Sequence, residues 1–407
     1  MTTKNVLALV TSASQARIRG IARYAKSAGW NLMLENQLAH GPKGWNGDGV
    51  LVTMKDSPAV IGYIDRIRRI GIPVVNLTGS FVPDGIPAVI GDNAKMGALA
   101  AEHFADRAFR HVAWFSTNWN RIQQQRAAAF AGEWRRLRPT ADAPLRFVWS
   151  ENSSARNRDD WFQQSKWLAK LLKSAPKPLG MFCYSDYDAS HVLGICRDNR
   201  IDVPREIAIL GVDNNTVICE NQSIPLSSVN HNLERVGYAG AALLDRLMRS
   251  GGKGDRGTGR RKTRNDAIIL IPPQGIITRR STETTAIADP LLRLAMVIIE
   301  RKLAKPLGAA QIADEMGIAR VRLDRLFARE LGTSVGREIL HQRMIIAKAL
   351  LRDTEMTLSE IASRTGFCNA GYLANTFRRE FNVTPGSYRA SVRAKDQARL
   401  VTGGRCR

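Results

Sequence analysis

The C-terminal part of the chain contains the same helical pattern twice, which limits what this part can fold into. The first copy runs from Leu307 to Ser334 and the second from Leu358 to Pro385. The matching positions are Ile312-Ala313 with Ile361-Ala362, Gly317 with Gly366, and Phe327 with Phe377. A repeated pattern of this kind indicates one structural unit used twice.

Each copy has the pattern of two short helices joined by a tight turn. In the first copy Ile312 starts an apolar spacing typical of a helix, and Gly317 is expected to end that helix. Leu323, Leu326 and Phe327 then predict the inner face of a second helix. This is the arrangement of a helix-turn-helix, whose second helix lies in the major groove of DNA. The alternative is an ordinary helical hairpin inside an all-helical domain.

The stretch from Asp289 to Ala390 resembles the AraC-type DNA-binding domain. The resemblance is carried by Ile361-Ala362, Gly366-Phe367, the stretch Phe377 to Phe381, Thr384-Pro385 and Tyr388-Arg389. It implies two helix-turn-helix units joined by a long helix, here residues 336–351. The two recognition helices would enter successive major grooves on one face of double-stranded DNA.

Helix geometry gives the candidates for contacts with DNA bases. The residues predicted to point outward are Val321, Asp324 and Arg325 in the first recognition helix, and Gly371, Tyr372, Asn375 and Thr376 in the second. Arg325 can donate two hydrogen bonds to a guanine, and Asn375 can pair in the same way with adenine. Gly371 offers no side chain, and Asp324 would repel phosphate while being able to accept from cytosine.

A second set of basic residues is expected to meet phosphates, which set affinity and register. These residues are Arg320, Arg322, Arg329, Arg378 and Arg379. The alternative for each is a solvated surface charge. The whole chain carries a net charge of +23, and residues 289–407 hold 21 Lys and Arg against 12 Asp and Glu. This balance agrees with a polyanionic partner without proving one.

Three further segments are predicted from composition. Residues 249–264 are glycine-rich with seven basic residues and one acidic residue, which predicts a solvated surface loop, or alternatively an extra phosphate contact. Residues 283–288 are expected to be a linker, and residues 391–407 a disordered basic tail.

The sequence argues against several other classes of protein. No run of 18 apolar residues occurs, so a membrane span is not expected, and the N-terminus lacks an apolar signal region. The five cysteines are scattered without a CxxC pair, which predicts reduced thiols in the cytoplasm and no zinc site. No phosphate-binding glycine loop, HExxH motif or nucleophile elbow is present, so we expect neither an enzyme nor a cofactor.

Residues 4 to about 280 alternate short apolar runs with amphipathic helical stretches. The predicted strands are 6–10, 49–53, 74–77, 88–90, 111–115, 146–149, 179–183 and 207–211. The predicted helices are 18–28, 59–70, 93–105, 121–136, 161–172, 189–199 and 235–249. Such alternation predicts an α/β fold of parallel sheets covered by helices, and the length favours two lobes.

Ligands of open α/β sheets bind beyond the carboxyl ends of the strands, and polar residues follow several of the predicted strands. They are Asp92 and Asn93, Ser185 and Asp186, Asp213 and Asn214, together with Arg126 on the helix after residues 111–115. Carboxylates accept from neighbouring hydroxyls, so this set suits a polyhydroxylated ligand. Trp45, Trp114 and Trp119 are candidates for an apolar face of the site.

This part of the chain resembles the periplasmic-binding-protein-like sensor domain of LacI-type regulators. The motifs are GWNGDGVLV (44–52), GIPVVNL (71–77), IGDNAKMGALAAEHF (90–104), RAAAF (126–130), IDVPREIAILGVDN (201–214) and LSSVNHNLERVGYAGAALL (226–244). The resemblance assigns residues 1–282 to the sensor and implies that Arg126 and Asp213 hold sugar hydroxyls. For Asp92 and Asp186, capping of a helix N-terminus and ligand binding both stay open.

A sensor of this type followed by an AraC-type domain resembles regulators of pentose catabolism. The order of domains therefore implies a transcriptional activator with D-xylose as effector, acting with RNA polymerase. The sensor is expected to form a homodimer through helices of the N-terminal lobe, such as 61–70 and 93–105, whose alternative role is to cover the sheet. Two other functions remain: a carbohydrate-binding protein with a helical appendage, and a DNA-binding regulator whose sensor only oligomerises.

Overall fold

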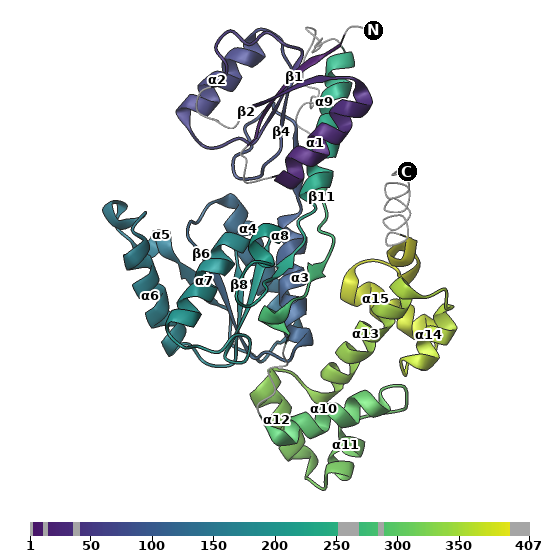
Figure 1. Cartoon of the computed structure of the whole chain (residues 1–407). Coiled ribbons are helices and arrows are strands. Elements are labelled where there is room, and N and C mark those ends of the chain that lie inside the picture. Colours follow the sequence, from purple (N-terminus) through teal and green to yellow (C-terminus); the bar gives the residue numbers. More distant parts are fainter. Residues whose placement is uncertain (1–2, 11–14, 36–40, 251–267, 284–288, 391–407) are drawn as a thin grey trace. The chain divides into compact units, whose positions relative to one another are not determined.

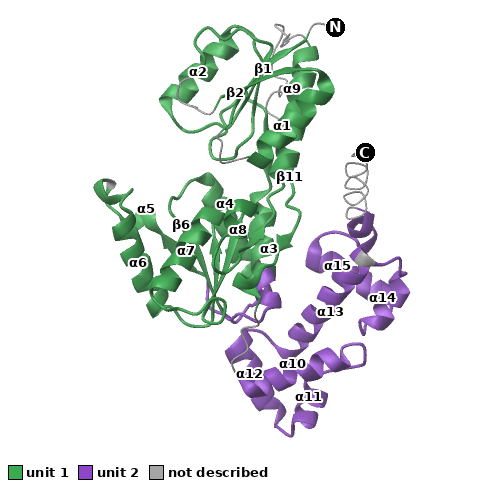
Figure 2. Cartoon of the chain, viewed as in Figure 1, with its two compact units in different colours: residues 1–102, 111–134, 144–284 green, residues 103–110, 135–143, 285–407 purple. Residues whose placement is uncertain are grey.

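The computed structural model describes residues 3–10, 15–35, 41–250, 268–283 and 289–390. The chain divides into two compact units (Figure 2). Unit 1 comprises residues 1–102, 111–134 and 144–284, and unit 2 comprises residues 103–110, 135–143 and 285–407. Most of the predicted basic loop (249–264), nearly all of the linker (283–288) and the whole of the tail (391–407) lie outside the described residues.

Unit 1 contains two α/β lobes, as the sequence predicts (Figure 1). The sheet of the N-terminal lobe has the strand order β11-β5-β4-β3-β1-β2, and all of its pairings are parallel. Its strands are β1 (Asn5–Leu9), β2 (Asn31–Glu35), β3 (Gly49–Val52), β4 (Val74–Asn76), β5 (Ala88–Gly91) and β11 (Ile268–Ile271).

Alternation along the strands decides which helix covers which face of this sheet. Val6 and Ala8 pack on one face with helices α1 (Gln15–Ala28) and α9 (Leu233–Arg249). Leu7 and Leu9 point to the other face, where α2 (Pro58–Arg69) covers them. The period of two is the expected geometry of a strand buried on both faces.

The sheet of the C-terminal lobe has the order β12-β10-β9-β8-β6-β7, and only β12 is antiparallel to its neighbour. The strands are β6 (His111–Ser116), β7 (Leu145–Val148), β8 (Leu179–Cys183), β9 (Ile207–Val212), β10 (Ser227–Val229) and β12 (Ile276–Ile277). The helical segments of this lobe are α3 (Asn93–Asp106), α4 (Arg121–Leu137), α5 (Trp149–Asn152), η2 (Ala155–Asn157), α6 (Trp161–Ser174), α7 (Asp186–Asp198), α8 (Thr216–Cys219) and η4 (Arg280–Thr282). Helices α6 and α7 cover one face of the sheet, while Phe130 of α4 contacts Phe182 on the other.

The chain passes between the lobes three times, at β5–α3, β10–α9 and β11–β12. The first crossing corrects one expectation, because the helix predicted at 93–105 does not belong to the N-terminal lobe. It lies in the C-terminal lobe, where Gly97 approaches the backbone of Arg126 and Phe130 in α4. After Gly91 the chain leaves β5 of the N-terminal lobe and enters α3 of the C-terminal lobe. The alternation of predicted strands and helices along the sequence does not reveal this change of lobe.

The C-terminal part is all helical, with α10 (Pro290–Lys302), α11 (Ala309–Met316), α12 (Arg320–Leu331), α13 (Val335–Asp353), α14 (Leu358–Arg364) and α15 (Ala370–Phe381). Each repeat has its own hydrophobic core, one around Phe327 and one around Phe377. The backbone repeats as well: Gly317 and Gly366 are left-handed, with φ of 64° and 75°. The turn that the sequence predicts is therefore present in both copies.

Unit 2 also contains two segments from earlier in the chain, which pack with the C-terminal helices. Arg138 follows α4 and forms an ion pair with Glu338 of α13, with 2.6 Å between Nη1 and Oε2. Their side chains are only 2% and 1% exposed. Nearby, Nε2 of His341 lies 2.8 Å from Oδ1 of Asp106. Unit 2 is thus held together by buried charges as well as by apolar packing.

Across the parts of the chain that the structure describes, none of the helices combines the length and apolar character needed to cross a membrane.

Candidate functional site

Three loops of the C-terminal lobe meet at the carboxyl edge of its sheet. Tyr184 to Asp186 follow β8, Asp213 to Asn215 follow β9, and His231 follows β10 by one intervening residue. Because β8, β9 and β10 are parallel neighbours, their carboxyl ends lie at the same edge. The structure therefore brings together the polar residues that the sequence placed at strand ends.

Asp213 is the carboxylate best placed to face a ligand at this edge. Its side chain is 37% exposed, and its Oδ1 lies 2.7 Å from Nδ1 of His231. Burial of the site acts to raise the pKa of Asp213, but the hydrogen bond to His231 and the charges of Arg126 and Arg17 outweigh it and lower the pKa. Asp213 is therefore ionised at neutral pH and can only accept hydrogen bonds.

His231 holds Asp213 in place as a neutral imidazole. Burial lowers the pKa of His231, even though the Asp213 carboxylate acts in the opposite direction. Since Asp213 can only accept, Nδ1–H of His231 must donate to it. The other nitrogen lies against Gly91, where a Cβ would come within 2.0 Å of Nε2. Glycine at this crossing between the lobes is what allows the ring to fit.

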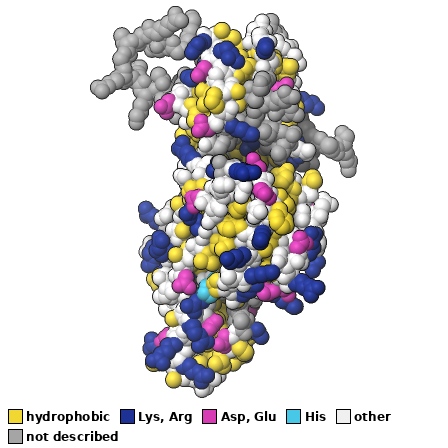
Figure 3. Space-filling view, turned by 90° about the vertical axis from the view of Figure 1, so that its left-hand side faces the viewer, with side chains coloured by type: hydrophobic (Ala, Val, Ile, Leu, Met, Phe, Trp, Pro, Cys, Tyr) yellow, Lys and Arg dark blue, Asp and Glu magenta, His cyan; other side chains and the backbone are white. Residues whose placement is uncertain are grey.

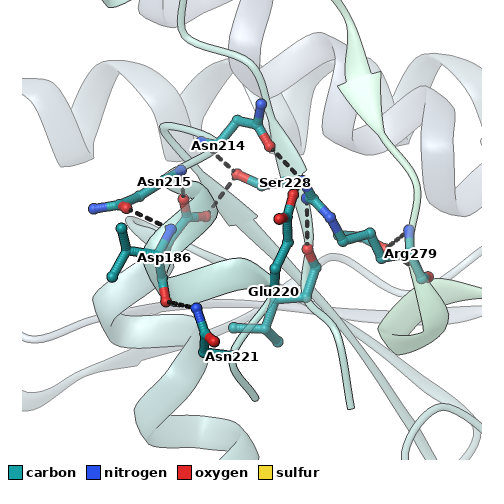
Figure 4. Close-up of polar contacts among 10 residues, drawn as sticks. Asp186, Asn214, Asn215, Glu220, Asn221, Ser228 and Arg279 are labelled. Atoms are coloured by element: carbon teal, nitrogen blue, oxygen red, sulfur yellow. Dashed lines mark hydrogen bonds and ion pairs between the residues drawn. The ribbon is translucent and has the colours of Figure 1, made fainter. Parts of the chain in front are cut away.

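Asp186 is buried, with 1% exposure, and Figure 4 shows its polar contacts. Its Oδ1 accepts from Oγ of Ser228 at 2.6 Å, and its Oδ2 accepts from the backbone N–H of Asn215 at 2.7 Å. Burial raises the pKa of Asp186 to about 7, and the negative charge of Asp213 adds to the shift. Oδ2 thus anchors the loop that carries Asp213 directly, and Oδ1 does so through Ser228, whose Oγ accepts from the N–H of Asn214 at 2.9 Å.

The same loop is fixed from the other side by Arg279, which lies just after β12 (Figure 4). Its Nη2 donates to Oδ1 of Asn214 at 2.9 Å and to Oε1 of Glu220 at 3.2 Å. Its Nη1 donates to the backbone oxygen of Leu226 at 2.9 Å. Asn214, predicted as a ligand residue, thus has its side-chain oxygen bound to Arg279.

Ser185 and Asp188 form a second acidic position, at the start of α7. The Ser185 hydroxyl caps the helix by accepting from the N–H of Asp188 at 3.1 Å, and it donates to Oδ2 of Asp188 at 2.9 Å. Oγ1 of Thr117 donates to the other oxygen of Asp188 at 2.8 Å. Burial raises the pKa of Asp188 to about 6.

Arg126 is buried, with 2% exposure, and links three elements around the site. Its Nη1 donates to the backbone oxygen of Tyr184 at 2.5 Å, and its Nη2 donates to Oδ1 of Asn93 at 2.9 Å. The pKa of Arg126 is lowered by burial, against the raising effect of Tyr184 and Asp213. Two of the predicted ligand residues, Arg126 and Asn93, therefore hold each other in place.

The structure shows the contacts of the predicted residues that neighbour this site. Asp92 caps α3, because its Oδ1 accepts from the N–H of Lys95 at 3.0 Å. Trp114 belongs to the core, where it contacts Phe182 edge to face, so it offers no apolar face to a ligand. Trp114 packs with Phe182, which also contacts Phe130 of α4. The apolar pattern of the strand does not reveal that its tryptophan is buried beneath a helix. Trp119 is partly exposed, with the Arg146 guanidinium 4.7 Å from its ring centre, and Trp45 is partly buried among residues packed under α2.

Several residues of the site were not predicted from the sequence, namely Tyr184, Asp188, His231, Ser228 and Arg279. His231 and Ser228 lie inside the recognised motif at 226–244, so that motif was the available signal. Tyr184 and Asp188 flank the predicted Ser185 and Asp186. Arg279 lies far away in sequence, and nothing in the local pattern links it to Asn214.

Within the described residues, no group of three or more His, Cys, Asp or Glu side chains is placed to hold a metal ion.

The two recognition helices, α12 and α15, present most of the predicted residues to solvent. The exposed ones are Val321, Arg320, Arg322, Arg325, Arg329, Gly371, Tyr372, Asn375, Arg378 and Arg379, and Asp324 is partly exposed. Thr376 is the exception, because it is only 2% exposed and does not point outward. It occupies the position of Leu326 in the first repeat, three residues after the buried Leu373, so it lies on the inner face of α15.

The arginines of these helices differ in their partners. Arg320 pairs with Asp324 at 3.6 Å, Arg329 with Glu330 at 2.6 Å, and Arg379 with Glu380 at 3.6 Å. Within residues 289–390, Arg322, Arg325 and Arg378 form no ion pair. In Figure 3, Lys and Arg side chains gather with a few acidic ones at the lower end, where Figure 1 shows α11 and α12.

Comparison with known proteins decides what these two parts are. Residues 101–282 match the model of a periplasmic binding protein-like domain, and residues 312–391 match that of a helix-turn-helix domain. The chain therefore carries a periplasmic-binding-protein-like domain followed by a helix-turn-helix domain of the AraC type. Both resemblances predicted from the sequence are thereby confirmed, and so is the predicted fold class.

Two relatives and one solved structure span nearly the whole chain. The xylose operon regulatory protein of Haemophilus influenzae is 26% identical over 385 residues, covering 91% of this chain and 94% of the relative. That of Escherichia coli K12 is 26% identical over 384 residues, covering 91% and 92%. The structure of a xylose-binding transcription activator matches with a TM-score of 0.57 at 23% identity, covering 96% and 99%. The relatives are regulatory proteins, in agreement with the expectation that the chain is not an enzyme.

Proposed function

We propose that this regulator is an activator of a pentose catabolic operon and that its effector is D-xylose. The observation that carries the proposal is an ionised, partly exposed carboxylate, Asp213, held by His231 at the edge where the chain crosses between two lobes. Two relatives that align over nearly the whole chain are named for xylose operons, which supports the choice of sugar.

A neutral sugar suits the electrostatics of this edge. Asp213 can accept from two adjacent hydroxyls. Burial already holds the pKa of Asp186 and Asp188 well above the ordinary value, so an additional negative charge would be unfavourable there. The proposed ligand residues are those predicted from the sequence: Arg126, Asp213, Asp92, Asn93, Asp186, Ser185 and Asn214. Among them, Asp213 is proposed to contact the sugar directly, while Arg126, Asn93 and Asp186 position the loops.

The DNA-binding part is proposed to span residues 289–390, after a sensor at 1–282 and a linker at 283–288. Arg325, Arg322 and Arg378 are the strongest candidates for DNA, because they are exposed and form no ion pair with any residue that the structure describes. The active form is proposed to be a cytoplasmic homodimer that binds two half-sites and contacts RNA polymerase. The helix at 61–70 remains the proposed dimer contact in the N-terminal lobe.

Titration calorimetry with D-xylose tests the ligand directly. We expect the full chain to bind D-xylose, and Asp213→Ala to weaken binding by at least about tenfold, because a hydrogen bond to a charged group contributes about 1.5–3 kcal/mol. Asp198→Ala is the matched control, since Asp198 is an exposed aspartate at the far end of α7.

Affinity for DNA is measured on the same proteins, because Asp213→Ala should keep sugar-independent DNA binding while losing the response to sugar. Equal binding of D-xylose by wild type and Asp213→Ala would remove Asp213 from the site. Binding of another pentose in preference to D-xylose would correct the effector and leave the regulator intact.

A further inference from the structure

Arg17, the third residue of α1, has no role in the site as described so far. It belongs to the N-terminal lobe, whereas Asp213, His231 and Tyr184 follow strands of the C-terminal lobe. Its Nε is shielded from solvent and has no hydrogen-bond partner within the described residues. A guanidinium carries five N–H donors, and a buried donor without an acceptor is unfavourable. Such a group points to an acceptor that arrives from outside the protein.

The backbone of Arg17 is held in a fixed position by close helix packing. Its carbonyl oxygen lies 2.1 Å from the position that a Cβ of Gly237 in α9 would occupy. One turn further along α1, a Cβ of Gly20 would lie 1.9 Å from the carbonyl oxygen of Glu234. Helix α9 begins two residues after His231, so the helix pair that fixes Arg17 also continues from the loop that holds Asp213.

The charge of Arg17 reaches all three loops of the site. It helps to lower the pKa of Asp213 and His231, which follow β9 and β10, and it opposes the rise that burial causes in the pKa of Tyr184, which follows β8. In return, burial lowers the pKa of Arg17 while Asp213 and Tyr184 act to raise it. The mutual effects agree with a position facing the carboxyl edge of the sheet.

The two arginines near Asp213 are used differently. The Nε of Arg126, like that of Arg17, has no partner within the described residues, but both terminal nitrogens of Arg126 already donate, to the backbone of Tyr184 and to Asn93. Arg17 has no hydrogen bond of this kind from its guanidinium within the described residues. It therefore combines with the partly exposed Asp213 to offer a donor fork from one lobe and an acceptor from the other.

We infer that Arg17 is a ligand-binding residue, which donates hydrogen bonds to hydroxyl oxygens of a neutral sugar that Asp213 holds from the opposite lobe. The inference rests on the proposed function, because it assigns a new residue to the same site. Binding then requires groups from both lobes, so the ligand stabilises their closed arrangement. A carboxylate ligand is disfavoured, since three aspartates already lie at this edge.

Calorimetry on the full chain with D-xylose, L-arabinose and D-ribose tests this assignment. Arg17→Ala should weaken binding of the preferred sugar by about 10- to 100-fold, as expected for loss of charge-assisted hydrogen bonds. Arg17→Lys should bind with intermediate affinity, because lysine keeps the charge but not the planar fork. Arg19→Ala is the control, since Arg19 is exposed on the same helix and should leave affinity unchanged. Melting curves establish that each variant is folded.

The outcomes separate this inference from the proposed function. If the wild-type chain binds sugar and Arg17→Ala binds it with the same affinity, the role of Arg17 is overturned and the proposed function stands. Failure of the wild-type chain to bind any of the three pentoses would overturn both. If Arg17→Ala does not fold, Arg17→Lys decides: unchanged affinity contradicts the inference, and weakened affinity supports it.

Discussion

Asp186 shows how burial turns a carboxylate from a ligand candidate into a structural group. Its carboxyl receives hydrogen bonds from Ser228 and from the N–H of Asn215, yet burial still raises its pKa to about 7. In the unfolded chain the pKa is near its ordinary value of 3.8. The folded state therefore holds this proton more tightly, and its stabilising contribution is lost as pH rises from about 4 through about 7.

Asp186→Asn should remove that part of the pH dependence. Asparagine has the shape of the protonated acid, so it can accept from Asn215 and donate to Ser228, but it does not ionise. We expect the melting temperature of the variant, relative to wild type, to rise between about pH 5 and about pH 8. Asp188 titrates in this range in both proteins and cancels in the difference, while Asp213, whose pKa is lowered, stays ionised throughout. A difference that is constant with pH would show that Asp186 does not titrate in this range.

The ion pair between Arg138 and Glu338 is the second residue-scale feature, and it lies inside unit 2. Arg138→Met should lower the free energy of unfolding by about 3–5 kcal/mol, because it leaves Glu338 buried without a partner. The double variant with Glu338→Leu should recover most of that loss, since an apolar pair needs no desolvation. Urea unfolding followed by circular dichroism measures both, with the exposed Arg135→Met as control. A single variant as stable as the control would contradict a buried ion pair.

At the scale of elements, the two recognition helices use the same framework with different surfaces. Leu323, Leu326 and Phe327 face the core of the first repeat, and Leu373, Thr376 and Phe377 face that of the second. The exposed faces differ, with Arg325 in α12 where α15 has Asn375. Such a pair is suited to reading two different half-site segments.

Arg325→Ala should reduce specific DNA binding by about 1–3 kcal/mol and relax the preference at one base pair, if Arg325 contacts a guanine. Fluorescence anisotropy with a panel of single-base operator variants, at one fixed salt concentration, measures this. Arg329→Ala is the comparison, because Arg329 is held by Glu330 and Asp289 and should have a smaller, sequence-independent effect. Uniform weakening by Arg325→Ala would instead identify a phosphate contact.

Most elements could be predicted from periodicity, because their apolar residues are buried on continuous faces. The missed strands are the exceptions: β2 and β11 are largely exposed, and β10 and β12 have only three and two residues. For the site, the loops after strands could be predicted, since parallel strands end at one edge. The partners could not, because Arg279 and Asn214 meet only through the sheet topology.

At the scale of the whole molecule, the account requires that sugar binding changes the population of the DNA-binding form. A tenfold change in DNA affinity needs about 1.4 kcal/mol of coupling between the two sites, and the sugar must bind one state better by that amount. The crossings at β5–α3, β10–α9 and β11–β12 are the places where the lobes can rotate. Their residues include Gly91 and His231, so closure and ligand contact involve the same part of the chain.

The most direct test is footprinting of the full chain on the DNA upstream of its neighbouring genes, with and without D-xylose at one salt concentration. The account predicts protection of two half-sites about one helical turn apart that strengthens when D-xylose is added. Protection that is the same with and without D-xylose would contradict gating by this sugar, and the absence of any protected site would contradict the regulator itself.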